Sequence, residues 1–190
     1  MVIKMNLSSL PAAALAAALV AAAAVLAFSE APALFVWAAF IGWASYDHSG
    51  GTTQAAIRSS VALIFGVLVA WLVALVVAAQ LLPLNTTAST AIVAGIASFL
   101  IVMASCSALL SVVPATFYGF ASTFAYLGLS PNASTVSAIT TPGWSNAILC
   151  LPISLLIGTG LGMVHGRLAK VLAAGSAVPG RALSPGGAAR

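Results

Sequence analysis

The sequence predicts an all-α membrane protein with six transmembrane helices, arranged as a 3+3 inverted repeat in which the second and fifth spans are short. Its 190 residues are 62 % hydrophobic and only 4 % charged, whereas a soluble domain carries about 25 % Asp, Glu, Lys and Arg. This composition excludes a soluble enzyme and a disordered chain. The net charge of +4 comes from dispersed residues, so no nucleic-acid partner is expected.

Six apolar segments follow one another along the chain. A helix rises about 1.5 Å per residue, so crossing a hydrocarbon core of about 30 Å takes about 20 residues. The runs are apolar on all sides, which favours helices over alternating strands. The segments cover residues 9–28, 31–46, 60–82, 89–113, 114–129 and 145–165. The first segment also resembles a secretory signal peptide, and this alternative stays open.

The positions of lysine and arginine predict the orientation, because cytoplasmic loops carry an excess of these residues. Six spans place both termini on one side. Arg58 is expected in the loop before the third span. All six positive residues then fall on that side: Lys4, Arg58, Arg167, Lys170, Arg181 and Arg190. The sequence therefore predicts a transmembrane bundle over residues 1–168 with cytoplasmic termini, and a mobile cytoplasmic tail over residues 169–190.

An internal repeat supports the count of six. Pro32-Ala33-Leu34-Phe35 opens the second segment, and the similar stretch Pro114-Ala115-Thr116-Phe117 opens the fifth. The shift that carries Pro32 onto Pro114 also lays residues 9–82 over residues 91–164. A unit of three spans is odd, so its copy must insert upside down, as in many transporters and channels.

The short second and fifth segments are the predicted solute path. Irregular backbone at membrane depth is tolerated only where it lines protein or a watery cavity. The candidate path residues are Trp37, Trp43, Tyr46, Asp47, His48, Thr116, Phe117, Tyr118 and Ser122. Asp47 beside His48 is the best candidate for a gate, because histidine changes its charge near neutral pH. The alternatives are an aromatic belt at the membrane interface and a plain polar turn, with Thr52 or Thr53 capping the next helix.

Spacing of small residues predicts close helix packing. The third segment carries Ala62, Gly66, Ala70, Ala74 and Ala78, and the sixth carries Gly158, Gly162 and Gly166. Whether these faces meet within one protomer or between protomers stays open, and a homo-oligomer is expected. His165 is expected to stabilise the end of the sixth helix. Cys106 and Cys150 are expected to be buried small hydrophobes.

No Asp, Glu, Lys, Arg or His falls in the middle of a span, although such residues normally mark proton relays and ion pathways. This absence favours a passive channel or facilitator for a small neutral or weakly polar solute, such as urea or an amide. A proton-coupled secondary transporter and a non-transporting membrane subunit are the alternatives. We expect no enzyme activity, no cofactor and no metal site, because no nucleophile–base pair or ligand cluster stands out.

Two motifs resemble YcdZ-like bacterial inner-membrane proteins, a domain-of-unknown-function family. The first is Trp37-Ala38-Ala39-Phe40-Ile41-Gly42 with Tyr46 and Gly50-Gly51, and the second runs over residues 109–119 with Ala125. The resemblance covers about residues 10–168. This sequence departs from the family pattern at Asp47-His48, where the family has Cys-Pro. The resemblance implies a bacterial inner-membrane protein with a similar number of spans, and it implies no substrate or site residues.

Overall fold

The computed structural model describes residues 9–175, which form seven helices and no strands. The all-α prediction is therefore confirmed over this part of the chain. The helices are α1 (Ser9–Ser29), α2 (Val36–His48), α3 (Thr53–Ala78), α4 (Thr86–Ala104), α5 (Val113–Leu129), α6 (Val136–Thr140) and α7 (Ala147–Gly175).

Four of these helices, α1, α3, α4 and α7, are long and apolar enough to cross a membrane. The two helices in the short predicted segments are α2, with 13 residues, and α5, with 17 residues. They measure about 20 Å and about 26 Å, so neither covers a hydrocarbon core of about 30 Å as helix alone.

Three helix boundaries differ from the predicted ones. The third helix begins at Thr53, because the Thr52 hydroxyl accepts a hydrogen bond from the Ala55 N–H, so Arg58 lies in a helix and not in the predicted loop. The fourth helix ends at Ala104, which leaves Cys106 exposed in the following connection and not buried as expected. The last helix continues to Gly175, so the predicted tail boundary at residue 169 falls inside α7, and residues 176–190 lie outside the described residues.

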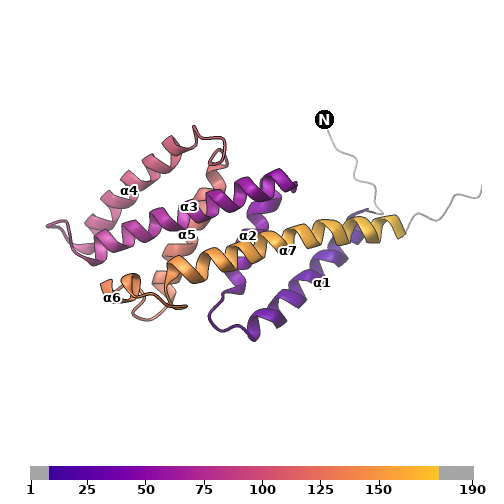
Figure 1. Ribbon diagram of the computed structural model, residues 1–190, viewed down its shortest axis with the longest axis horizontal. Helices are drawn as coiled ribbons and strands as arrows, with labels where there is room; N and C mark the ends of the chain where they lie inside the picture. The colour runs from indigo at the N-terminus through magenta and orange to yellow at the C-terminus, as the bar shows by residue number, and fades with distance from the viewer. Residues whose placement is uncertain (1–8, 176–190) are drawn as a thin grey trace, which may run out of the picture.

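The bundle is organised around two central helices, α3 and α7, which also contact each other. Figure 1 shows α1 lying along α7 and α4 lying along α3, while α2 and α5 cross the central helices obliquely. The main packing partners are α2 with α7 and α5 with α3. Each half of the chain therefore contributes one central helix, and the short helix that packs on it comes from the other half.

Glycines make these two crossings close. A methyl group built at Gly42 of α2 would overlap the Leu155 carbonyl of α7, and one built at Gly158 of α7 would overlap the Ala39 carbonyl of α2. Any larger side chain would push the backbones apart, which is how small residues let helices associate in lipid.

The second crossing uses the same arrangement. A methyl group at Gly119 of α5 would overlap the Leu63 carbonyl of α3, and one at Gly66 of α3 would overlap the Thr116 carbonyl of α5. The small-residue faces of the third and sixth segments therefore meet short helices of the same chain at these glycines.

The repeated motif predicts one sequence offset between the two halves, but the matching glycines of the two crossings are related by two different offsets. The shift that carries Gly42 onto Gly119 is smaller than the one that carries Gly66 onto Gly158. The difference arises in the connections. Residues 49–52 alone join α2 to α3, whereas the much longer stretch of residues 130–146, which includes α6, joins α5 to α7.

Two ends of the bundle differ in chemistry. The basic end contains the turn at residues 49–52 and the described cations Arg58, Arg167 and Lys170. The loop end contains the connection at residues 130–146 together with Pro32 and Phe35 at the start of α2, which line one recess with it.

Candidate functional site

Two predicted path residues, His48 and Tyr118, meet at the basic end. His48 is the last residue of α2, and Tyr118 lies in the second turn of α5. The His48 Nδ1 and the Tyr118 hydroxyl oxygen are 3.3 Å apart, and the contact is exposed. The two rings are T-shaped, with centroids 6.0 Å apart. This polar contact joins the short helices of the two halves.

Tyr46 holds the turn that follows α2. Its hydroxyl donates to the Gly51 carbonyl oxygen at 2.6 Å, and the Gly51 N–H donates back to the Tyr46 carbonyl oxygen at 3.1 Å. Gly50 and Gly51 have φ angles of 103° and 63°, which favour glycine. The alternative of a polar turn capped by Thr52 is therefore what the structure contains around Tyr46.

Asp47 borders a recess at the basic end with a volume of about 520 Å³. The Asp47 side chain is exposed, and Arg167 and Lys170 line the same recess from α7. This recess is accessible from the basic end and carries both signs of charge.

His165 has a different position from the one expected. It lies ten residues before the end of α7 and does not cap that helix. Its Nε2 is 3.3 Å from the Ala13 carbonyl oxygen of α1, and its ring centroid is 5.1 Å from that of Trp43. Trp43 is thus half-buried between α2 and α7 and serves to pack them.

The predicted hydroxyls of α5 are buried, and two neighbouring ones bond to their own helix. The Ser122 hydroxyl donates to the Tyr118 carbonyl oxygen at 2.7 Å, and the Thr123 hydroxyl donates to the Gly119 carbonyl oxygen at 3.1 Å. Thr116 is 1 % exposed and presents its carbonyl to Gly66 at the crossing. In this conformation Ser122 and Thr116 support helix packing.

Two of the predicted path residues, Trp37 and Phe117, contact aromatic rings outside the predicted set. Trp37 packs near Phe35, with ring centroids 5.8 Å apart. The ring centroids of Phe117 and Phe120 are 6.3 Å apart, and Phe124 follows them in an aromatic row along α5. The structure therefore does not gather the predicted path residues into one lining.

Aliphatic side chains fill the seam between the halves. Leu63 and Val67 of α3 and Leu151 and Leu155 of α7 are all fully buried in one cluster. Polar groups gather instead at the two ends, on either side of this aliphatic layer.

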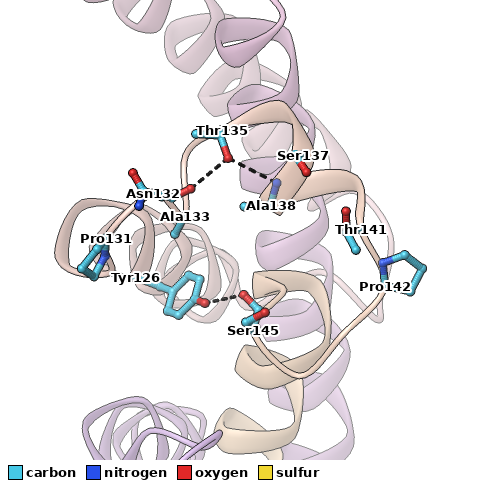
Figure 2. Close-up of a pocket in the computed structure, with 10 residues that line it drawn as sticks. All are labelled: Tyr126, Pro131, Asn132, Ala133, Thr135, Ser137, Ala138, Thr141, Pro142 and Ser145. Atoms are coloured by element: carbon cyan, nitrogen blue, oxygen red, sulfur yellow. Dashed lines mark hydrogen bonds between the residues drawn. The ribbon is translucent and has the colours of Figure 1, made fainter.

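The loop end holds a second polar recess that sequence reasoning missed. Its volume is about 370 Å³, and the Tyr126 hydroxyl donates to the Ser145 carbonyl oxygen across it, as Figure 2 shows. A neighbouring recess of about 360 Å³ is also lined by Tyr126 and Ser145, and it reaches Phe35 and Trp144. Clustered Ser, Thr, Asn and Pro residues at 130–146 were the available signal, but such a composition is also typical of an ordinary loop.

Comparison with known proteins identifies a family but no activity. A family model described as "Protein of unknown function (DUF1097)" matches residues 14–170. No curated protein and no solved structure matches the chain.

Proposed function

We propose that this chain, which belongs to the DUF1097 family of proteins of unknown function, is a passive facilitator for a small neutral or weakly polar solute, of the urea or amide class. The matched glycine crossings of α2 on α7 and α5 on α3 are the observation that carries this proposal. They fit two three-helix units of opposite orientation, which is a common architecture of transporters and channels.

Six spans remain part of this proposal. The short helices α2 and α5 are joined to non-helical stretches at residues 30–35 and 105–112, and these stretches would complete their crossings. Non-helical backbone at membrane depth is tolerated where it is buried in protein or lines a cavity. The seam beside the short helices is where both conditions would hold.

The charge distribution supports the orientation and the neutral solute. In α1, α3, α4 and α7, the Asp, Glu, Lys, Arg and His side chains are confined to Arg58, His165, Arg167 and Lys170, towards the basic end. We therefore place the basic end in the cytoplasm of a bacterium, with the protein in its inner membrane. A charged solute would find no counter-ion along the apolar remainder of the seam.

A solute can pass only if the halves move, because Leu63 and Leu155 fill the seam. The short helices touch at both ends of that layer. His48 meets Tyr118 at the basic end, and the Phe35 ring lies 5.2 Å from the Tyr126 ring at the loop end. We propose that these contacts open in turn. The path then never becomes a continuous pore.

Liposome flux tests the proposal. Vesicles with the purified protein should equilibrate urea, acetamide or glycerol faster than protein-free vesicles, as measured by stopped-flow light scattering. The rate should not depend on an imposed proton gradient. His48→Ala and Tyr118→Phe should raise the rate, because each removes the closing contact. Unchanged flux in His48→Ala and Asp47→Ala would exclude both residues from gating.

The filled seam also favours a second candidate, a membrane subunit that transports nothing. Rates equal to those of protein-free vesicles for all three solutes would favour this candidate. A rate that follows the proton gradient would instead favour a proton-coupled transporter.

A further inference from the structure

The connection at residues 130–146 is longer than its counterpart and is firmly held. The matching connection at the basic end reverses the chain within residues 49–52. At the loop end, the same reversal takes all of residues 130–146, which include the short helix α6. The additional length is not needed for turning the chain, so another role has to explain it.

Buried hydrogen bonds give this connection a defined shape. The side-chain amide of Asn146, which is 4 % exposed, donates to the carbonyl oxygens of Ile139 at 2.7 Å and Thr141 at 3.0 Å. The Trp71 indole N–H of α3 donates to the same Ile139 oxygen at 3.0 Å. The loop is therefore tied to the bundle, and binding a ligand there would cost little ordering entropy.

The cavity beside this loop is an open recess with a polar, uncharged lining. Ten residues line its volume of about 370 Å³, and none carries a charge. Four of them have side chains that form no hydrogen bond within residues 9–175, and Figure 2 shows them around the cavity: Asn132, Ser137, Thr141 and Ser145. The volume lies within the range of small-molecule sites, about 300–1,000 Å³.

An apolar wall adjoins these polar groups. Phe35, Trp144 and Pro32 line the neighbouring recess, which shares Tyr126 and Ser145 with the first. A ligand spanning both would meet hydroxyl and amide groups on one side and rings on the other. Neither recess offers an ion a counter-charge, whereas a neutral polar molecule would exchange water for these hydrogen bonds.

We propose that this loop-end cavity is the external binding site of a small uncharged molecule that carries hydroxyl or amide groups. Its assignment as the entry point for a transported solute rests on the proposed function, but the binding itself does not. Asn132, Ser137, Thr141 and Ser145 would supply the hydrogen bonds, and Tyr126 would separate the bound molecule from the seam.

Ligand-observed NMR by saturation transfer, on the full chain in nanodiscs, tests the site with glycerol, acetamide and acetate as probes. Glycerol or acetamide should bind, and acetate should bind at least tenfold more weakly. The double variant Ser137→Ala/Thr141→Val should weaken binding about 25-fold, because two hydrogen bonds of about fivefold each are lost. Thr140→Val is the matched control, since the Thr140 hydroxyl donates to the Val136 carbonyl oxygen and does not line the cavity.

Ser137→Phe provides an independent check, because a ring at this exposed position would fill the cavity without disturbing the core. It should abolish the glycerol and acetamide signals. Binding of acetate as tight as that of acetamide, or equal binding by the wild type and both cavity variants, would overturn the proposal. Binding without liposome flux would keep the site and end the transport function. Selective flux that the cavity variants leave unchanged would keep the transport function and exclude this cavity as the entry site.

Discussion

The two helix crossings are built alike, but the connections beside them are not. Gly42 and Gly158 bring α2 against α7, and Gly119 and Gly66 bring α5 against α3 in the same way. At the basic end the chain reverses in a short turn, while at the loop end residues 130–146 fold into a capped, hydrogen-bonded loop. The comparison separates what the bundle needs for packing from what has been added at one end.

The crossings should be equally sensitive to a single methyl group. Gly158→Ala and Gly66→Ala should each lower the free energy of unfolding by about 1–3 kcal/mol, because the added Cβ overlaps a backbone carbonyl and the helices must separate. Thermal unfolding followed by fluorescence-detected size exclusion measures this effect.

Gly160→Ala and Gly95→Ala are the matched controls, since a methyl group at either position meets nothing within 4 Å. Alanine has the higher helix propensity, by about 1 kcal/mol, so these variants should be neutral or slightly stabilised. A large loss from Gly158→Ala with none from Gly66→Ala would show that the two crossings are not equivalent.

The two connections should respond differently to loss of a side-chain hydrogen bond. Asn146→Ala leaves the Ile139 and Thr141 carbonyl oxygens without their amide donor at a buried site, which should cost about 1–3 kcal/mol. At the basic end, Ser49→Ala removes a bond from the Ser49 hydroxyl to the Ser45 carbonyl oxygen within one helical turn and should cost under about 0.5 kcal/mol. Similar losses from both variants, measured by denaturant unfolding, would contradict a firmly held loop.

Two tyrosines sharpen the comparison at the basic end. Tyr46→Phe removes a hydrogen bond from a buried side chain to the Gly51 carbonyl oxygen and should lower the free energy of unfolding by about 0.5–1.5 kcal/mol. Tyr118→Phe removes only the exposed contact with His48, so its stability should stay within about 0.5 kcal/mol. If Tyr118→Phe proves as destabilising as Tyr46→Phe, its contact with His48 is structural and does not gate a path.

Local chemistry was readable from the sequence in several places. The first helix was predicted at residues 9–28 and lies at Ser9–Ser29, because an uninterrupted Ala and Leu run has high helix propensity. The Thr52 cap was predicted as an alternative for the turn, since threonine before a helix accepts a backbone N–H.

Other expectations failed because they depended on distant parts of the chain. His165 was assigned to a helix end, but its surroundings are Trp43 and Ala13, which only folding brings near. The shared Pro-Ala-x-Phe motif suggested one shift for the whole repeat, yet no single shift relates both pairs of crossing glycines. A short motif cannot report an insertion that lies after it, such as the residues of α6.

By itself, the sequence determined that the chain is helical and apolar enough for lipid, because both properties are set by composition and by residues within one helical turn. It also marked the small-residue faces around Gly66 and Gly158. Only the tertiary structure decided that Ala39 lies against Gly158 and Thr116 against Gly66. It alone folded the polar stretch at residues 130–146 around an open recess, because both outcomes depend on backbones that pack closely across long sequence separations.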